Sequence, residues 1–159
     1  MDQAELKRVL HYDPETGVFT WRVSLSWRGK IGAEAGNIFR RYRHIRIHGK
    51  LYRVARLAWL YTMGEWPPLD VDHVDGDGLN NRWRNLREAT VSQNLANARR
   101  RKDNTSGYKG VFRYPMGFRA RIYVGGKTLH LGCRATAEEA HALYVAAARR
   151  HFGEFARVE

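Results

Sequence analysis

Cysteine, long apolar runs and acidic residues are all scarce in this sequence of 159 residues. The single cysteine, Cys133, excludes an internal disulfide and a cysteine-rich zinc knuckle, and it favours a reducing, intracellular setting. The longest uncharged apolar stretch, 57–64, is far shorter than the ~20 residues of a membrane helix, so we expect no membrane partner. The first ten residues carry both charge signs and no apolar segment, so we expect neither a secretory signal nor a transit peptide.

Basic residues far outnumber the acidic ones. The chain has 28 Lys and Arg against 16 Asp and Glu, a formal net charge of +12 and a pI near 10.3. This excess makes a polyanion the first partner to consider. Because 43% of the residues are hydrophobic, the chain can bury a core and is not a disordered basic tail. We therefore expect a folded protein of the cytoplasm or nucleoid that meets a nucleic acid.

Short strands and one helix are predicted in the first half. Residues 17–22 follow a turn signal, and 45–47 and 51–54 flank a short His-Gly-Lys turn as a hairpin would. Residues 55–63 have helical spacing of their apolar side chains. We expect the segment 64–68, Gly-Glu-Trp-Pro-Pro, to end that helix, because proline cannot continue its hydrogen bonds.

The second half is predicted to change from a loop and helix to a small sheet. A strand at 71–74 precedes a Gly- and Asn-rich loop, and the capping box Thr90-x-x-Gln93 opens a helix that we expect to run into the basic residues 99–102. Residues 103–107 are typical of a linker. Three alternating strands (109–114, 118–123 and 127–131) and a helix from a second capping box (136–152) follow. These patterns predict an α+β fold.

One constellation has the parts of a phosphodiesterase: Asp72-His73, then Asn85, then Asn94. Phosphodiester hydrolysis needs a base for water, a hard cation and a group that holds the base. Histidine suits the base because an unperturbed imidazole, with a pKa of ~6.5, is largely neutral at physiological pH. Carboxylate and amide oxygens suit Mg²⁺ or Mn²⁺ better than zinc.

The stretch VDHVDGDGLNNRWRNLREATVSQNLANARR resembles the HNH endonucleases of the ββα-metal group, in the branch whose last His is replaced by Asn. The resemblance implies that His73 is the general base, that Asn85 orients it, and that Asp72 and Asn94 bind one divalent metal, Mg²⁺ or Mn²⁺. It also implies a nuclease domain at 1–102 with its ββα-metal core at about 68–100. No small-molecule cofactor is expected.

Two features of this region are interpreted as structural. Related sequences often carry a His just before the Arg-Leu of the preceding helix, where this chain has Ala55, and we expect an effect on local packing or substrate contact only. Asp75, Asp77 and Asn80 are interpreted as turn formers. A calcium loop counted from Asp75 fails, because its twelfth position is Leu86 where an acid is required.

A second basic feature lies in the predicted C-terminal sheet. Strand alternation puts Arg119 and Arg121 on one face, and we expect Arg113 and Lys127 to join them. Such a row can enter a major groove or contact phosphates, although a charged strand face is more often simply solvated. The full set of predicted DNA-binding residues is Arg99, Arg100, Arg101, Lys109, Arg113, Arg119, Arg121 and Lys127. The run at 99–102 also has a plain interpretation, as cations opposing a helix macrodipole.

The segment from YKGVFR through LHLG to ATAEEAHALYVAAA resembles the APETALA or ethylene-response-factor type of DNA-binding domain. That resemblance implies a sheet that meets the major groove of double-stranded DNA and a helix behind it, over 108–159. The same module is known appended to phage and intron HNH nucleases, so it implies a homing-type endonuclease.

Two other functions stay open at this stage. The chain could be a non-catalytic DNA-binding regulator on a decayed nuclease scaffold, although retention of all four candidate residues argues against decay. It could also bind or cut structured RNA, since charge alone does not distinguish the two nucleic acids. The sequence leaves the target site, the number of strands cut and the oligomeric state open.

Overall fold

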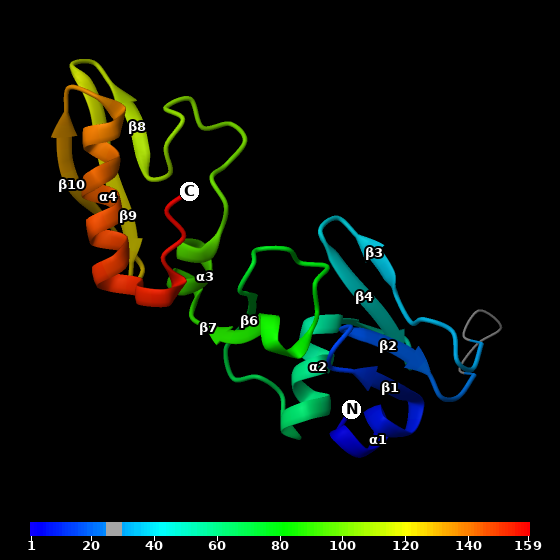
Figure 1. Ribbon diagram of the computed structural model, residues 1–159. Coiled ribbons are helices and arrows are strands. Elements are labelled where there is room, and N and C mark those ends of the chain that lie inside the picture. Colours follow the sequence, from blue (N-terminus) through cyan, green and yellow to red (C-terminus); the bar gives the residue numbers. More distant parts are fainter. Residues whose placement is uncertain (25–29) are drawn as a thin grey trace. The chain divides into compact units, whose positions relative to one another are not determined.

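The computed structural model describes residues 1–24 and 30–159, and it confirms the α+β fold. The chain forms two compact units, Met1–Glu88 and Ala89–Glu159, and each is described by itself (Figure 1). None of the described helices is both long enough and apolar enough to cross a membrane.

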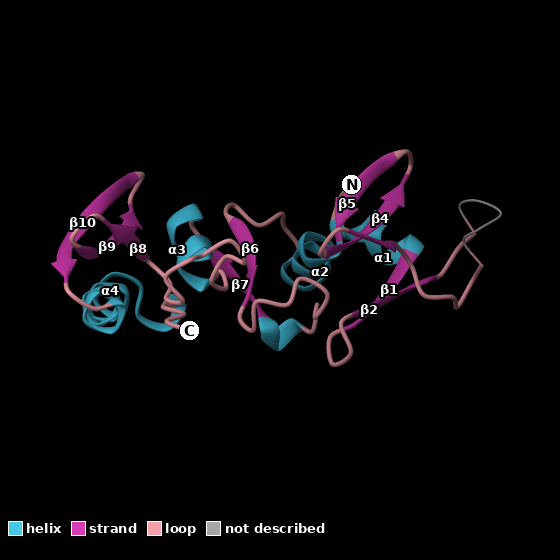
Figure 2. Ribbon diagram, turned by 90° about the horizontal axis from the view of Figure 1, so that it is seen from above, coloured by secondary structure: helices cyan, strands magenta, loops and turns pink. Residues whose placement is uncertain are grey.

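The first unit combines two short α-helices with three small sheets (Figure 2). Strands β1 and β2 pair antiparallel, β3, β4 and β5 form a three-stranded antiparallel sheet, and β6 pairs with β7. Its elements are α1 (Gln3–Val9), β1 (Leu10–Asp13), β2 (Val18–Trp21), β3 (Asn37–Phe39), β4 (Tyr42–Ile47), β5 (Lys50–Arg53), α2 (Val54–Met63), β6 (Asp70–His73), the 3₁₀ turn η1 (Trp83–Asn85) and β7 (Leu86–Ala89), whose last residue lies in the second unit.

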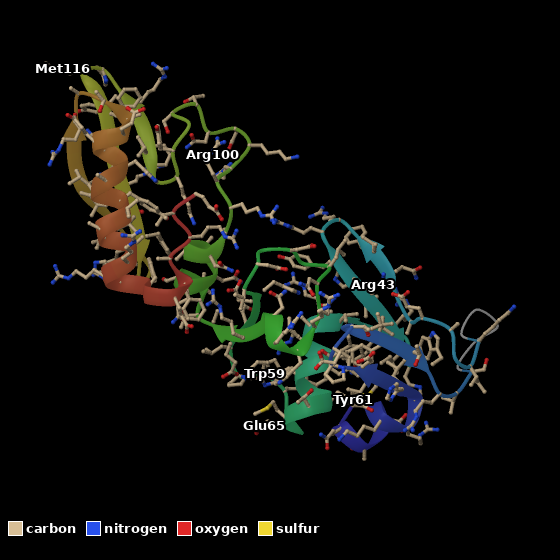
Figure 3. All side chains as sticks on the ribbon, viewed as in Figure 1. Arg43, Trp59, Tyr61, Glu65, Arg100 and Met116 are labelled. Carbon is tan, nitrogen blue, oxygen red and sulfur yellow. The ribbon has the colours of Figure 1, made fainter. Side chains whose placement is uncertain are left out.

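The predicted hairpin and helix of the first unit are confirmed as β4–β5 and α2. Leu57 and Leu60 of α2 are fully buried in the core of the unit, and Tyr61 packs at its edge against the ring of Tyr12 (Figure 3). The predicted stop at 64–68 is confirmed in position, because the helix ends at Gly64. The cause differs from the prediction: Gly64 adopts the left-handed conformation with φ of 87°, before any proline is reached.

The second unit is a three-stranded antiparallel sheet with helices α3 and α4. Its strands lie in the order β10-β9-β8, with α4 packed against β9 and β10, and Met116 stands at the β8–β9 turn (Figure 3). The elements are α3 (Val91–Asn97), β8 (Val111–Tyr114), β9 (Gly117–Val124), β10 (Lys127–Arg134), α4 (Ala137–Phe152) and the 3₁₀ turn η2 (Gly153–Phe155). Both predicted capping boxes form, at Thr90 and at Thr136.

Helix α3 is shorter than predicted, because it ends at Asn97 instead of running into the basic residues 99–102. Its last carbonyls are taken by cations from elsewhere in the sequence. Lys109 Nζ donates to the carbonyls of Ala96 and Ala98, and Arg157 Nε donates to that of Asn97. These hydrogen bonds place positive charge at the helix C-terminus, which is the role that was expected of the basic run at 99–102.

Candidate functional site

Strand β6 carries two of the predicted site residues, Asp72 and His73, and both are buried. Neighbouring residues of a strand point to opposite faces, so the carboxylate and the imidazole leave β6 in opposite directions. On its side, Asp72 Oδ2 accepts a hydrogen bond of 3.1 Å from Nε of Arg87, which stands on β7. This buried ion pair ties β6 to β7.

The loop after β6 is held by side-chain hydrogen bonds to its own backbone. Asp75 Oδ1 accepts from the Asp77 N–H at 2.8 Å, and Asp77 Oδ1 accepts from the Leu79 N–H at 3.0 Å. Burial raises the pKa of Asp75, but the hydrogen bonds from Asp77, Asn80 and Asn85 outweigh it and bring the pKa below its ordinary value. Asp75, Asp77 and Asn80 therefore have the turn-forming roles predicted for them.

Asn85 ties this loop to η1. Its amide nitrogen donates to Asp75 Oδ1 and to the Asn80 carbonyl, and its amide oxygen accepts from the Asp75 N–H. The Asn85 carbonyl accepts from the N–H of Val74, the residue that follows His73. An orienting effect of Asn85 on His73 stays a prediction, and these bonds give it an indirect route through the backbone.

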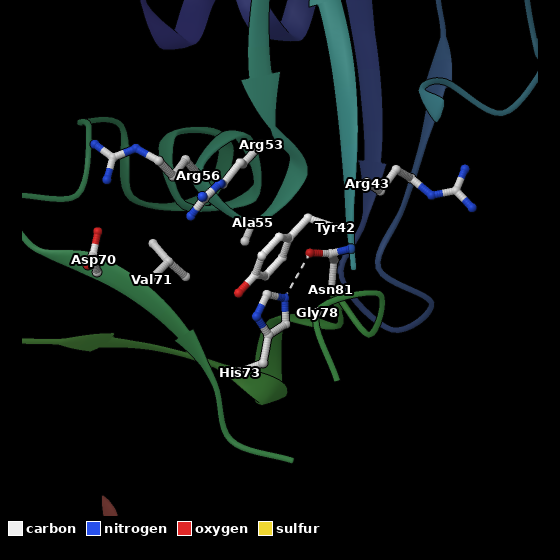
Figure 4. A pocket seen from close by; sticks show the side chains of 10 residues that line it. All are labelled: Tyr42, Arg43, Arg53, Ala55, Arg56, Asp70, Val71, His73, Gly78 and Asn81. Carbon is white, nitrogen blue, oxygen red and sulfur yellow. Dashed lines mark hydrogen bonds between the residues drawn. The ribbon is translucent and has the colours of Figure 1, made fainter. Parts of the chain in front are cut away.

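The Asn81 side chain meets the imidazole, and it was not among the residues predicted from the sequence. His73 Nε2 lies 3.1 Å from Asn81 Oδ1, and both residues are buried (Figure 4). The Asn81 amide nitrogen donates to the Leu79 carbonyl, so the amide oxygen faces the ring. An oxygen acceptor requires a donor, and Nε2 therefore carries the proton in the neutral imidazole, which leaves the lone pair on Nδ1.

Asn81 is itself fixed by the β1–β2 hairpin. The Tyr12 hydroxyl donates to the Asn81 carbonyl at 2.7 Å. At Gly17, which has a φ of 75°, a Cβ atom would collide with the backbone of Asn81. The hairpin turn thus packs directly on the residue that holds His73, and any side chain at Gly17 would displace it.

A small pocket opens beside His73, with a volume of about 20 Å³, which is room for one water molecule. A nucleotide would therefore lie against this site instead of being enclosed by it. Ala55 forms part of the wall, so the position where related sequences carry His is next to the imidazole. The lining residues are Tyr42, Arg43, Arg53, Ala55, Arg56, Asp70, Val71, His73, Gly78 and Asn81 (Figure 4).

Tyr42 joins this pocket to the β3–β5 sheet. Its ring centroid lies 6.2 Å from that of His73, and the guanidinium of Arg53 lies 4.7 Å from the centre of the same ring. A Cβ at Gly78 would come within 2.6 Å of the Tyr42 ring, so the loop after β6 approaches the tyrosine as closely as glycine allows. In Figure 4, Arg53 lies on the side of the ring toward α2, whereas Arg43 points away.

The fourth predicted site residue, Asn94, lies in the first turn of α3 in the second unit. Asn94 therefore belongs to a different compact unit from Asp72, its predicted partner in metal binding. Within residues 1–24 and 30–159, no three His, Cys, Asp or Glu side chains gather as a metal cluster. The predicted pair, one carboxylate and one amide, is a different kind of ligand set, made of the hard oxygen donors that suit Mg²⁺ or Mn²⁺.

In the second unit, the sheet separates Arg119 and Arg121 from the core as predicted. Ala120 and Ile122 are buried, at 0% and 5% exposure, on the side of α4. The two arginines lie on the opposite side together with aromatic rings. The Arg119 guanidinium is 3.8 Å from the ring centre of Tyr114, and that of Arg121 is 3.7 Å from that of Phe112.

Arg113 and Lys127 do not belong to this face, and their predicted placement was wrong. Directly paired residues of antiparallel strands point to the same side of a sheet. Arg113 is paired with Phe118, which packs with the buried residues on the side of α4. Lys127 is paired with Val124, which lies on that side too.

Lys109 was predicted to contact DNA, but its donors have other partners. Its ammonium donates to the carbonyls of Ala96, Ala98 and Arg157, at 2.5, 2.6 and 3.0 Å. These are all three of its N–H groups, and burial together with the charge of Arg157 lowers the pKa of Lys109 to about 8. Lys109 therefore joins α3 to the C-terminal segment, and we leave it out of the proposed DNA-binding residues.

The basic run that follows α3 is exposed. Arg101 forms two hydrogen bonds with Asp103, at 3.0 and 2.9 Å. Arg99, Arg100 and Arg101 border a surface hollow of the second unit that also reaches Arg121 of the sheet. Arg99, Arg100 and Arg101 therefore lie on the same unit as Arg121 and beside the same hollow.

Comparison with known proteins identifies the central region. Residues 52–96, from β5 to α3, match the HNH endonuclease family. The chain contains an HNH endonuclease domain. An uncharacterised HNH endonuclease of Acanthamoeba polyphaga mimivirus is 38% identical over 103 residues, which cover 62% of this chain and 53% of the relative. This chain thus spans about half the length of that relative, and no solved structure matches it significantly.

The HNH endonuclease domain contains all four predicted site residues and also three that were not predicted: Asn81, Arg87 and Arg53, whose guanidinium lies over Tyr42. Asn80 and Asn81 are adjacent and identical in type, and no spacing rule tells which of them turns toward the histidine. Arg87 was missed because β7, the strand that carries it, shows no clear alternation and was not predicted.

Proposed function

We propose that this protein is a metal-dependent DNA endonuclease that hydrolyses phosphodiester bonds through the HNH endonuclease domain. The observation that carries the proposal is the hydrogen bond from His73 Nε2 to Asn81 Oδ1, which assigns the lone pair of the imidazole to Nδ1. A neutral histidine held in one tautomer is what a general base requires. The match of residues 52–96 to HNH endonucleases supports the same reaction.

In the proposed reaction, His73 takes a proton from the attacking water at Nδ1. Asn81 accepts from Nε2–H throughout, so the imidazolium that forms keeps its second N–H paired. Tyr12 and the β1–β2 turn hold Asn81 in place, which limits the rotation of the ring. Asn85 keeps the loop after His73 closed.

Asp72 and Asn94 are the residues proposed to hold the divalent cation, Mg²⁺ or Mn²⁺. Such an ion supplies positive charge to the scissile phosphate and the leaving oxygen. The guanidinium of Arg87 pairs with the Asp72 carboxylate and therefore competes with the cation for its oxygens. The donor chemistry of the two side chains fits this class of metal.

Binding of double-stranded DNA is proposed for the second unit, through the outer sheet face with Arg119 and Arg121 and through Arg99, Arg100 and Arg101. The APETALA-like resemblance of 108–159 and the alternation of arginines with Phe112 and Tyr114 support this proposal. A homing-type role belongs to the same proposal, which covers either a sequence-tolerant or a site-specific enzyme.

The test is a plasmid-nicking assay with Mg²⁺ or Mn²⁺, repeated with a chelator and with His73→Ala. We expect the wild type to convert supercoiled plasmid to nicked or linear forms, the chelator to stop it, and His73→Ala to lose cleavage while it retains DNA affinity. Undiminished cutting by His73→Ala would remove this residue from the mechanism. Binding without cutting under every metal condition would support the non-catalytic regulator instead. Faster cleavage of folded RNA than of duplex DNA would reassign the substrate.

A further inference from the structure

The segment 35–64 is strongly basic, and the proposed function gives most of its cations no role. It contains seven Arg or Lys residues and no Asp or Glu, in a chain whose net charge is +12. It forms β3, β4, β5 and α2 in the first unit. Its cations are Arg40, Arg41, Arg43, Arg46, Lys50, Arg53 and Arg56.

Strand register sorts this segment into two faces. Ile45 and Ile47 of β4 are buried in the core. The residues that alternate with them along the strand, at 42, 44 and 46, therefore face outward. Pairing of His44 with Arg53, of Arg46 with Leu51 and of Phe39 with Tyr42 extends that side across the sheet. We call this the outer face of β3–β5, and it comprises Phe39, Tyr42, His44, Arg46, Leu51 and Arg53.

The outer face is cationic and partly apolar. Phe39 is 61% exposed, and the guanidinium of Arg40, from the β3–β4 turn, lies 5.5 Å from the centre of its ring. In the described part of the chain, the carboxylates that pair with segment 35–64 bind residues that are not on the outer face. Glu34 pairs with Arg43, which shares the side of Ile45, and Glu5 binds His48 in the β4–β5 turn.

The β3–β4 turn keeps a cation at a position that favours glycine. Arg40 has a φ of 59°, in the left-handed region that side chains other than Gly and Asn rarely adopt. It stands in a two-residue turn, because Phe39 and Tyr42 are directly paired on either side of it. This arrangement offers a clean substitution, since glycine at this position removes the charge and relieves the backbone.

The outer face is continuous with the His73 site. Tyr42 belongs to both, since its ring lies beside the His73 imidazole and under the Arg53 guanidinium (Figure 4). A strand of nucleic acid whose phosphate lies at His73 would therefore have its neighbouring phosphates near the cations of this sheet. All of these residues lie within the first unit.

We propose that the outer face of β3–β5 binds the phosphate backbone of duplex DNA next to the bond that His73 attacks. The inference rests on the proposed nuclease function and adds a second DNA-binding surface, separate from the sheet of the second unit. Arg46 and Arg53 of this face, together with Arg40 of the β3–β4 turn, form a cationic surface without a carboxylate among them, which is complementary to a phosphate backbone. A small antiparallel sheet with exposed arginines and an exposed ring has the shape and chemistry that suit a DNA groove.

The experiment measures the salt dependence of affinity for a short DNA duplex by fluorescence anisotropy, in a His73→Ala background so that the duplex stays intact. The test variant adds Arg40→Gly and Arg46→Gln. The matched control adds Arg149→Gln and Arg150→Gln, which remove the same number of charges from exposed positions of α4 that belong to neither proposed DNA surface. Thermal unfolding checks that both variants fold, and we expect Arg40→Gly to cause no loss of stability.

We expect the test variant to lower the slope of log affinity against log salt by about 0.9 for each phosphate that it no longer neutralises. If the lines meet near 1 M salt, affinity at 0.1 M should fall roughly eightfold for each such phosphate. The control should keep the wild-type slope.

An unchanged slope in the test variant, or an equal fall in the control, would overturn the proposal. Tighter binding of the wild type to folded RNA, abolished in the same variant, would overturn duplex DNA as the partner. Lack of cleavage by the wild-type chain would refute the nuclease function but leave the slopes standing, so the two failures can be told apart.

Discussion

Replacing Asn81 by aspartate should move the pH dependence of cleavage to higher pH. The substitution keeps the size of the side chain and puts a carboxylate oxygen where Oδ1 lies, 3.1 Å from His73 Nε2. An opposite charge within about 4–6 Å stabilises a protonated imidazole by roughly 1–3 pH units. Since the base must be neutral, the acid limb of the pH–rate profile should shift upward by that amount.

The magnitude on the acid side follows from this shift. At a pH below the wild-type limb, each unit of displacement lowers the unprotonated fraction about tenfold, so a shift of one to three units should make Asn81→Asp roughly 10- to 1,000-fold slower than wild type there. At pH well above the shifted limb the rate should recover. Asn81→Leu removes the acceptor altogether, which leaves a buried N–H unpaired at a cost of about 1–3 kcal/mol and frees the other tautomer. Its rate should stay low at every pH.

The assay is single-turnover cleavage of a duplex from pH 5.5 to 9.5, for the wild type and both variants. Tyr12→Phe is the comparison variant, because it removes the hydroxyl that holds the Asn81 carbonyl but adds no charge, so it should lower the rate without moving the acid limb. A two-bond ¹H–¹⁵N spectrum of the wild type should report His73 with its proton on Nε2. Parallel profiles for Asn81→Asp and Asn81→Leu, or a proton on Nδ1, would refute the reasoning.

Three further predictions concern the second unit and the metal. Arg119→Ala with Arg121→Ala should weaken DNA binding and lower the slope of log affinity against log salt by about 0.9 per phosphate. Arg113→Ala, on the other side of the sheet, should leave the slope unchanged. Equal slopes for both variants would mean that Arg119 and Arg121 lie on a face that is only solvated. The folded chain releases the Lys109 proton near pH 8 and the unfolded chain near ~10.4, so stability should rise with pH between these values. Urea midpoints of wild type and Lys109→Met at pH 7.5 and 9.5 check this, and a rise in both would assign it to another group. Asp72→Asn should raise the concentration of Mg²⁺ needed for half-maximal cleavage, as a metal titration would show, and an unchanged titration would exclude Asp72 as a ligand.

The parts of the fold that could be predicted are those whose signal is local. Both capping boxes, α2 and the β4–β5 hairpin are set by residues three to four positions apart, and all of them form. Strands β3 and β7 were missed because they are three and four residues long and exposed or mixed in burial, so they show no clear alternation. Helix α1 had a usable signal, since Asp2 caps it three residues before Glu5.

The positions of side chains across strands could not be predicted from alternation within a strand. Alternation correctly placed Arg119 and Arg121 together, because both lie on β9. Arg113 and Lys127 lie on different strands, and their side of the sheet depends on which residues pair across β8, β9 and β10. A register shift of one residue would have reversed the outcome. The same reason hid Asn81, whose direction depends on the hairpin turn packed behind it.

The division of the chain bears on how the proposed site is built. A linker was predicted at 103–107, but the compact units divide after Glu88, and the HNH endonuclease domain at 52–96 extends across that boundary. The reason lies in α3. Its Ala96 packs in the core of the second unit, and Lys109 holds the carbonyls at its end. The position of Asn94, the proposed metal ligand on this helix, is therefore set by the core of the unit that carries the proposed DNA-binding sheet. We therefore expect Lys109→Met, which removes the donor to the carbonyls at the end of α3, to lower metal-dependent cleavage as well as stability, and undiminished cleavage by the folded variant would contradict the metal-binding role of Asn94.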